Sequence, residues 1–171
     1  MYNFAIQKHN MNQIIIFFAK YLFIASGLIA LWVLNHESKF NRKTLMLRGI
    51  IVLLVGVALA KIGGALYIEQ RPFVALHIAP LIPHNAENGF PSDHALVTFG
   101  IAFLLMPFSL PAGLIALIVA TAVSIGRVES YLHTPLDIFA SIFFAAVASV
   151  LASKIVRTDR RNAKSIAEPV S

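Results

Sequence analysis

The sequence predicts an all-α membrane protein, a polytopic bundle of about five transmembrane helices plus a short N-terminal interfacial segment. Of its 171 residues, 58% are hydrophobic and 13% are charged, whereas globular domains average about 45–50% apolar and about 25% charged residues. A transmembrane helix needs roughly 20 apolar residues, so this length allows about five or six spans and no separate soluble domain. The sequence contains no cysteine, which excludes disulfide bonds and thiolate metal sites.

The N-terminal region predicts an interfacial element followed by the first span. Residues 1–10 are too polar to cross a membrane, and Phe4 and Ile6 are expected to contact lipid from a short helix. The first span is predicted at residues 12–34, where Lys20 can extend to the membrane edge as a snorkelling anchor.

Four further apolar runs complete the bundle. The second span is predicted at residues 47–68 and contains Lys61 about two turns before its end. Residues 69–92 contain four prolines and are predicted to form a long loop. The remaining spans are predicted at residues 93–106, 114–126 and 136–156.

The distribution of lysine and arginine predicts the orientation in the membrane. The two basic regions, residues 36–48 and 154–164, are expected in the cytoplasm. Five spans then place the N-terminus outside. Residues 1–156 are expected to form one membrane-embedded domain, and residues 157–171 a basic cytoplasmic tail. The net charge of +6 is attributed to these regions, so no nucleic-acid partner is expected.

Three polar segments interrupt the apolar runs, and this topology places all of them at the outer face. They are Lys61 with Arg71-Pro72, the stretch Phe90–His94, and the stretch Arg127–Asp137. Ionisable side chains at the mouth of membrane helices are costly and are usually functional. The spans are therefore expected to bring the three segments together in one site.

The residue types in these segments suit a phosphate group. Arg71 and Arg127 carry planar guanidinium groups that match phosphate oxygens, and Lys61 supplies a point charge. Helices are expected to begin near Ser92 and Thr134, and the free backbone N–H groups of a helix N-terminus bind anions. Together these groups predict an oxyanion pocket.

Two histidines in the same segments are candidates for acid, base or nucleophile near neutral pH, namely His94 and His133. Asp137 follows His133 by four residues, about one helical turn, and can hold its imidazole in one tautomer. An oxyanion pocket with two imidazoles indicates phosphoryl transfer.

The order Arg-Pro, Pro-Ser-x-His and Arg-x5-His-x3-Asp resembles the phosphatidic acid phosphatase type 2 superfamily of membrane lipid phosphatases. The resemblance covers about residues 61–137. It implies that His133 attacks phosphorus, that Asp137 orients His133, and that His94 protonates the leaving oxygen. The substrate-binding residues that we expect from it are Lys61, Arg71, Pro72, Ser92, Asp93 and Arg127.

The sequence departs from the family pattern at three positions. The usual lysine stands seven residues before Arg71, where this chain has Gly64, and the nearest lysine is Lys61. Asp93 replaces the usual glycine, a variant that resembles the bacterial undecaprenyl-diphosphate phosphatase branch. Gly126 stands where a serine commonly precedes the second arginine, which removes one donor to phosphate.

Structural roles compete with these functional ones. Ser92 and Thr134 fit helix caps, with Asp137 at the third helical position of a capping box. Arg127 fits a helix C-terminus, where the dipole favours a cation. The histidines outside the motifs are expected to lie in loops. Three residues near Arg71 could either support the site from behind or lie at the membrane interface, and the interface is the favoured interpretation. The histidines are His9, His36, His77 and His84, and the three residues are Tyr67, Glu69 and Gln70.

We expect a phosphatase of the bacterial plasma membrane, with its site facing outside, that converts undecaprenyl diphosphate to undecaprenyl phosphate and phosphate through a phosphohistidine. Phosphatidylglycerophosphate and phosphatidate are the alternative substrates. The non-enzymatic alternatives are an anion or lipid transporter and an inactive lipid-binding protein. No cofactor or metal is expected because the carboxylates do not cluster. The expected partners are the lipid substrate and membrane lipids, and the oligomeric state stays open.

Overall fold

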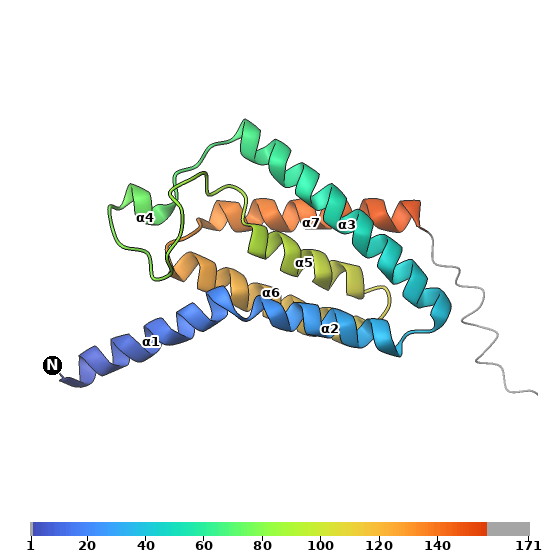
Figure 1. Cartoon of the computed structure of the whole chain (residues 1–171), viewed down its shortest axis with the longest axis horizontal. Coiled ribbons are helices and arrows are strands. Elements are labelled where there is room, and N and C mark those ends of the chain that lie inside the picture. Colours follow the sequence, from blue (N-terminus) through green and yellow to red (C-terminus); the bar gives the residue numbers. More distant parts are fainter. Residues whose placement is uncertain (1, 157–171) are drawn as a thin grey trace, which may run out of the picture.

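The computed structural model describes residues 2–156, and side chains from residue 9 onward. The described part contains helices and no strand (Figure 1), which confirms the all-α class. The helices are α1 (Tyr2–Lys20), α2 (Phe23–His36), α3 (Lys39–Leu66), α4 (Pro72–Ala75), α5 (Asp93–Leu105), α6 (Leu110–Glu129) and α7 (Pro135–Ile155). The predicted tail at residues 157–171 and the lipid contacts predicted for Phe4 and Ile6 lie outside the described residues and side chains.

Among the described helices, α3, α6 and α7 are each long and apolar enough to cross a membrane. The pair α1 and α2 passes the same test as one broken span, from His9 to His36. The third predicted span corresponds to α5, which has only 13 residues. At 1.5 Å per residue this is about 20 Å, less than the hydrocarbon thickness of about 30 Å. The chain is therefore a multi-pass helical membrane protein, as predicted, and α5 returns the chain through the bundle although it is too short to meet the length of a full span (Figure 1).

The first span, predicted for residues 12–34, is built from two helices with a bend between them. The chain is helical from Tyr2, so the expected interfacial segment continues into α1, and the axis bends by 43° between α1 and α2. At the break, the Leu22 N–H donates to the carbonyl of Phe17, five residues back, whereas the Ala25 N–H donates to Leu22, three residues back. This change of hydrogen-bond spacing accounts for the bend without proline or glycine.

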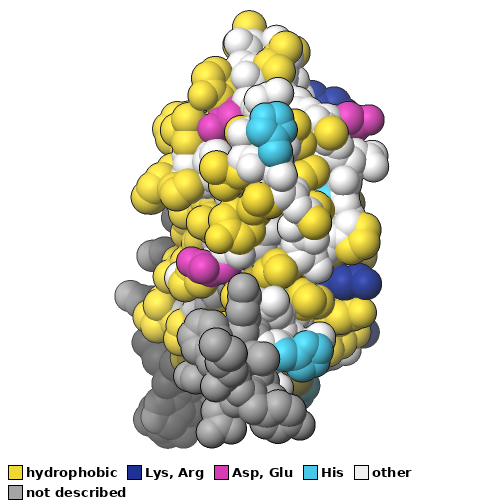
Figure 2. Space-filling model, turned by 90° about the vertical axis from the view of Figure 1, so that its left-hand side faces the viewer, with side chains coloured by type: hydrophobic (Ala, Val, Ile, Leu, Met, Phe, Trp, Pro, Cys, Tyr) yellow, Lys and Arg dark blue, Asp and Glu magenta, His cyan; other side chains and the backbone are white. Residues whose placement is uncertain are grey.

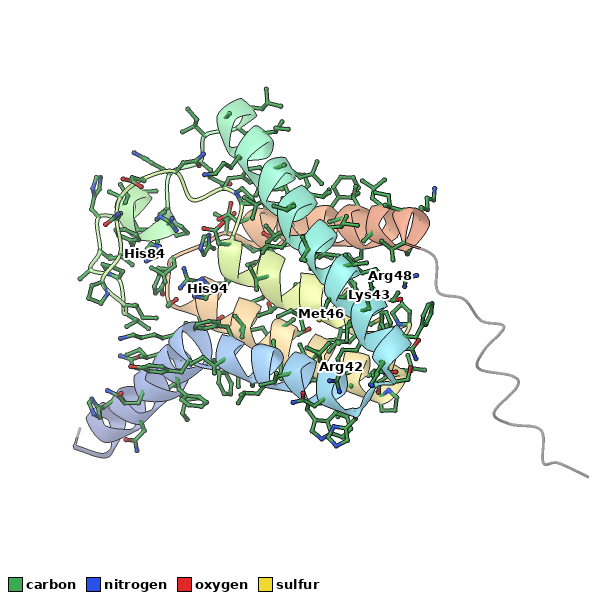
Figure 3. The ribbon with its side chains drawn as sticks, turned by 45° about the vertical axis from the view of Figure 1, so that its right-hand side comes forward. Arg42, Lys43, Met46, Arg48, His84 and His94 are labelled. Atoms are coloured by element: carbon green, nitrogen blue, oxygen red, sulfur yellow. The ribbon has the colours of Figure 1, made fainter. Side chains whose placement is uncertain are left out.

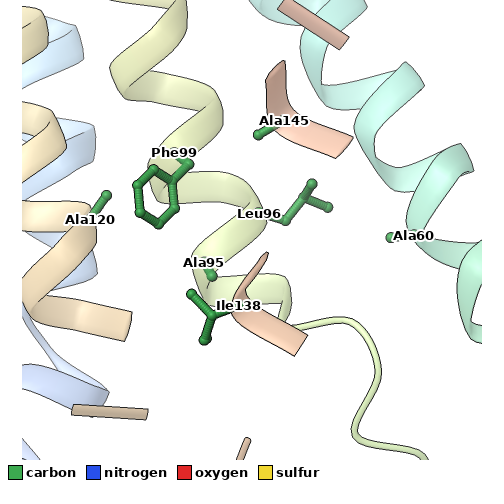
Figure 4. Packing of buried hydrophobic residues seen from close by; sticks show 7 residues of the cluster. All are labelled: Ala60, Ala95, Leu96, Phe99, Ala120, Ile138 and Ala145. Carbon is green, nitrogen blue, oxygen red and sulfur yellow. The ribbon is translucent and has the colours of Figure 1, made fainter. Parts of the chain in front are cut away.

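The short helix α5 lies at the centre of the bundle, against α2, α3, α6 and α7. Its buried side chains pack mainly against small residues of the helices around it (Figure 4). The cluster consists of Ala95, Leu96 and Phe99 of α5 with Ala60, Ala120, Ile138 and Ala145. Alanine at these positions lets the helices approach closely. The covering helices bury α5, so it can be shorter than the membrane is thick.

Large apolar side chains cover the outside of the bundle, as expected for a lipid-facing surface. Leu54 is 64% exposed, Ile118 69% and Phe139 68%. The end of the molecule that carries the α3–α5 connection differs, because acidic, basic and histidine side chains appear there among apolar ones (Figure 2). The end of α3, the starts of α5 and α7 and the end of α6 meet at this end (Figure 1).

Candidate active site

A cavity of about 440 Å³ opens where the three polar segments meet. Its charged and polar lining comes from α3, the α3–α5 connection, the first turn of α5, the last turn of α6 and the α6–α7 loop. These residues are Lys61, Arg71, His84, Asn88, Asp93, His94, Arg127 and His133. Of the residues predicted from sequence, Pro72, Ser92 and Asp137 are not part of the lining. Figure 3 shows His94 on α5 and His84 on the connection near it.

His133 lies in the loop before α7 and is only 3% exposed. Its Nδ1 is 3.0 Å from the carbonyl oxygen of Gly89 and 3.3 Å from Oδ2 of Asp137. Both partners are acceptors, so Nδ1 carries the ring proton. Nε2 is 3.2 Å from Nη2 of Arg127 and 3.4 Å from Nη1 of Arg71, which can only donate. The free electron pair of His133 is therefore on Nε2, between two cations.

Asp137 is fully buried and has both of the roles weighed from sequence. Its Oδ2 accepts a hydrogen bond from the Thr134 N–H at 2.8 Å, and its own N–H donates to the Thr134 hydroxyl at 3.2 Å. This is the predicted capping box at the start of α7. The same Oδ2 accepts from His133, so the helix cap holds the carboxylate that fixes the imidazole.

The two arginines approach the cavity from different elements. Arg71 precedes α4 and donates from Nη1 to the Leu132 carbonyl at 3.0 Å and from Nη2 to the Asn88 carbonyl at 3.3 Å. Arg127 lies in the last turn of α6 and is 4% exposed. Within the described part of the chain, the Nε atoms of both are buried without an acceptor. Buried cations with unused donors require an anion nearby, which a phosphate supplies.

The surroundings of His133 and His84 lower the pKa of both imidazoles. Burial lowers the pKa of His133, as do Arg127 and Arg71, while the hydrogen bond to Asp137 works against this shift. Burial, Arg71, Arg127 and His133 lower the pKa of His84 to about 4, which makes His84 neutral at pH 7. A neutral imidazole with a free Nε2 is the reactive form of a histidine nucleophile.

His94 occupies the first turn of α5 and lines the cavity. Its ring packs edge-on against Phe23 of α2, with 5.2 Å between the ring centroids. Ser92, just before it, makes no capping hydrogen bond with its side chain, and the hydroxyl is buried without a partner among the described residues. Pro72 is the first residue of α4, where it follows Arg71.

Two of the departures from the family pattern have steric causes. A Cβ atom on Gly64 would lie 3.0 Å from the Phe90 carbonyl oxygen, because the α3–α5 connection packs on α3 there. Lys61, one turn earlier, lines the cavity instead. A Cβ atom on Gly126 would lie 2.7 Å from the backbone nitrogen of Ala19, so α1 occupies the space that a serine would need.

Three residues near the site were not predicted from sequence. Asn88 makes four hydrogen bonds that tie the end of α3 to the connection. Its Nδ2 donates to the Gly64 and Tyr67 carbonyls, and its Oδ1 accepts from the Glu69 and Phe90 N–H groups. Asn-Gly, at residues 88–89, is a turn signal that could have drawn attention to this position.

The other two were assigned to different surroundings. His84 was expected to be an ordinary loop histidine, but it lines the cavity. Glu69 was assigned to the membrane interface, but it lies beside Asp137: a Cβ atom on Gly89 would lie 3.5 Å from the Glu69 carbonyl oxygen and 3.6 Å from Oδ2 of Asp137. Both lie in the α3–α5 connection, and no motif marks them.

The arrangement combines a histidine held in one tautomer, three cations and a second imidazole in one cavity. Lys61, Arg71 and Arg127 provide positive charge, and Asp93 is the acidic residue in the lining. Among the described residues, no group of three histidines or carboxylates is placed to hold a metal ion. This geometry suits in-line attack by His133 on phosphorus, with the guanidinium groups stabilising the charge on the phosphoryl oxygens.

Comparison with known proteins points to the same chemistry. A family model described as the PAP2 superfamily matches residues 45–161. The chain is 34% identical over 143 residues to the bacitracin transport permease protein BcrC of Bacillus licheniformis, which covers 82% of this chain and 69% of that protein. It is 28% identical over 150 residues to the undecaprenyl-diphosphatase BcrC of Bacillus subtilis strain 168, which covers 85% of this chain and 76% of that protein. No solved structure gives a significant match.

Proposed function

The chain belongs to the PAP2 superfamily and is a membrane lipid phosphatase, and we propose that it hydrolyses undecaprenyl diphosphate to undecaprenyl phosphate and inorganic phosphate. The observation that supports this most is the state of His133. Its Nδ1 proton is held by Asp137 and Gly89, and its Nε2 lies beside two guanidinium groups. That is the environment a nucleophile needs to attack a phosphate anion.

In the first step, Nε2 of His133 attacks the terminal phosphorus. The bond from that phosphorus to the bridging oxygen breaks, and this oxygen leaves on undecaprenyl phosphate with a proton from His94. The histidine carries the phosphoryl group, and Asp137 stabilises the positive charge on its ring. Water then attacks the phosphohistidine, His94 accepts a proton from the water, and inorganic phosphate leaves.

The choice of a lipid diphosphate rests on charge and on relatives. Lys61, Arg71 and Arg127 line one cavity, and a diphosphate carries more negative charge than a monophosphate to balance them. The Bacillus subtilis relative is named an undecaprenyl-diphosphatase. These observations favour undecaprenyl diphosphate over phosphatidylglycerophosphate or phosphatidate.

The name of the Bacillus licheniformis relative, a transport permease, favours the transporter as a second candidate. A transported anion needs cations along its path but no imidazole held in one tautomer. His133→Ala distinguishes the candidates, because it should abolish phosphate release by an enzyme and leave anion movement by a transporter measurable.

We also propose that the site faces the outside of a bacterial plasma membrane. The basic residues Arg42, Lys43 and Arg48 lie at the end of the bundle opposite the loop that carries His84 (Figure 3). Basic ends of membrane helices stay in the cytoplasm. The cavity is then at the outer surface, where a lipid diphosphate can enter from the outer leaflet.

Phosphate release from purified protein in detergent tests the substrate. The panel contains undecaprenyl diphosphate, phosphatidylglycerophosphate and phosphatidate, each with EDTA and with added Mg²⁺. We expect the highest kcat/KM for undecaprenyl diphosphate and little effect of EDTA. Higher kcat/KM for a monophosphate would contradict the substrate, and strict dependence on Mg²⁺ would contradict the mechanism.

A further inference from the structure

Glu69 is fixed in the same network as the nucleophile. Its N–H donates to Oδ1 of Asn88, and its carbonyl accepts from the Gly89 N–H, both at 2.9 Å. The carbonyl of Gly89 in turn accepts from Nδ1 of His133 at 3.0 Å. Asn88 and Gly89 therefore hold the backbone of Glu69, and the carbonyl of Gly89 accepts the proton of His133 Nδ1.

The carboxyl group of Glu69 faces Asp137 on the first turn of α7. The charge of Asp137 acts on this carboxyl group, and a Cβ atom on Gly89 would lie 3.5 Å from the Glu69 carbonyl oxygen and 3.6 Å from Oδ2 of Asp137, so the two residues lie side by side. Oδ2 of Asp137 already accepts from His133 and Thr134. Oδ1 of Asp137 and Oε2 of Glu69 are both buried, and neither has a donor among the described residues.

Glu69 is half-buried with one buried carboxyl oxygen, and Asp137 is fully buried. Two ionised carboxylates in this arrangement are unfavourable, because the buried oxygens lose their hydration and the two charges repel each other. One proton removes both problems, since a carboxylic acid donates a hydrogen bond that a neighbouring carboxylate accepts. Asp137 has two N–H donors that stabilise its charge, from His133 and Thr134. The proton therefore belongs on Glu69.

We propose that Glu69 is a positioning residue that keeps a proton and donates it in a hydrogen bond to Asp137, so that the carboxylate orienting His133 is held from both sides. The inference rests on the phosphatase site of the proposed function but not on the identity of the lipid. The order of contacts is Glu69, Asp137, His133 and then the phosphoryl group. Removing the donor should loosen the Asp137 carboxylate.

The electrostatic surroundings agree in sign with this proposal. Burial raises the pKa of Glu69, and the charge and the carboxyl group of Asp137 raise it further, while the Thr134 hydroxyl opposes the shift. The other charged or titratable groups around Asp137 are His133 and Arg71. Glu69 then keeps its proton at pH values where a free glutamate has lost it. As the pH rises through this raised pKa, a second negative charge forms beside Asp137, and activity should fall.

Glu69→Gln tests the proposal directly, because an amide donates a hydrogen bond and does not ionise. Activity on p-nitrophenyl phosphate is measured against pH for the full-length protein, for Glu69→Gln, for Glu69→Ala, and for Gln70→Ala at the exposed neighbour as control. Glu69→Gln should keep its activity near neutral pH and lose the fall at alkaline pH. Glu69→Ala should lose about 10-fold or more near neutral pH, a loss of the size seen when a group that orients a metal ligand is removed. Equal losses in both variants, with an unchanged alkaline fall in Glu69→Gln, would overturn the proposal.

Infrared spectroscopy gives a second readout that needs no substrate. A protonated carboxyl group has a carbonyl-stretching band that ionised carboxylates lack. This band should titrate in the unmodified protein and in Gln70→Ala, and the part of it due to Glu69 should be missing in Glu69→Gln. A spectrum unchanged by Glu69→Gln would refute the proposal even if the enzyme is active. The band remains testable if another lipid proves to be the substrate.

Discussion

At the residue scale, the two imidazoles in the cavity differ in their partners. His133 has partners on both ring nitrogens, two acceptors at Nδ1 and two cationic donors at Nε2. His94 packs on Phe23 and lines the cavity without comparable contacts. A histidine held in one tautomer suits a nucleophile, and a less constrained one suits proton transfer.

This difference predicts how each histidine variant responds to the leaving group. His133→Ala should abolish turnover of every substrate, because no phosphoenzyme can form. His94→Ala should lose about 10²–10⁴-fold on an alkyl monophosphate, whose alkoxide needs a proton in order to leave. The loss should be smaller on p-nitrophenyl phosphate and on a diphosphate, whose leaving groups are more stable anions. Steady-state rates with the three substrates check this, and equal losses of His94→Ala on all of them would leave His94 as a phosphate binder.

Asn88 should matter for stability as well as for activity. Asn88→Asp keeps the acceptor for the Glu69 and Phe90 N–H groups but loses the donor to the Gly64 and Tyr67 carbonyls. Leaving such carbonyls unsatisfied costs about 1–3 kcal/mol. We expect a lower free energy of unfolding and reduced activity, since Asn88 also places Gly89 and accepts from Arg71. Thermal unfolding compared with Asn85→Asp, an exposed position in the same connection, checks this. Equal stability of the two variants would contradict it.

The site residues that sequence predicts are those held by local spacing or marked by the motifs of the three polar segments. His133 and Asp137 are four residues apart, and their contact follows from one turn of helix. Glu69, His84 and Asn88 belong to the site because a long connection folds back over it, and no periodicity specifies that path. Asn88, for example, contacts Gly64 across 24 positions of sequence.

At the element scale, apolar runs predict that helices exist but not where they break. The bend between α1 and α2 contains neither proline nor glycine, so no residue marks it. The start of α3 at Lys39, rather than at residue 47, follows from the Ser38 side chain, which accepts from the Asn41 N–H. The predicted capping box at Thr134 is present because Asp137 stands at the third helical position.

Packing of the α3–α5 connection on α3 predicts that the lysine that we propose to bind phosphate, Lys61, cannot be replaced by one at position 64. Lys61→Ala should weaken phosphate binding by about 1.5–3 kcal/mol, the range for hydrogen bonds to charged groups. Adding Gly64→Lys should not restore activity, because a Cβ atom there would lie 3.0 Å from the Phe90 carbonyl oxygen. The measurements are KM for the substrate and the inhibition constant of inorganic phosphate. Recovery of both in the double variant would mean that the connection can move away from α3.

At the scale of the whole molecule, composition and the order of the polar segments are enough to predict a membrane bundle with one polar end. The shortness of α5 is harder to predict, because the helix is apolar like the others and its burial at the centre is evident only in the structure. Three of the four buried residues that the other helices add to its cluster are alanines, a feature that becomes meaningful only once the helix pairs are known.

The orientation of the bundle can be tested with single cysteines, because the sequence contains none. Asn85→Cys, on the connection over the cavity, should react with a membrane-impermeant maleimide in intact cells. Lys39→Cys, at the start of α3 on the opposite end, should react only after lysis. Both positions are exposed. The reverse pattern would place the cavity in the cytoplasm.

The central claim is that His133 receives the phosphoryl group, and trapping the phosphoenzyme tests it most directly. Undecaprenyl diphosphate labelled in its terminal phosphate is mixed with the protein, the reaction is quenched in alkali, and peptides are mapped by mass spectrometry. We predict a labelled phosphate on His133 in the unmodified protein and none in His133→Ala. The label should increase in His94→Ala when loss of His94 slows hydrolysis of the phosphoenzyme more than its formation. Continued turnover with no label on His133, or with the label on another residue, would contradict the account.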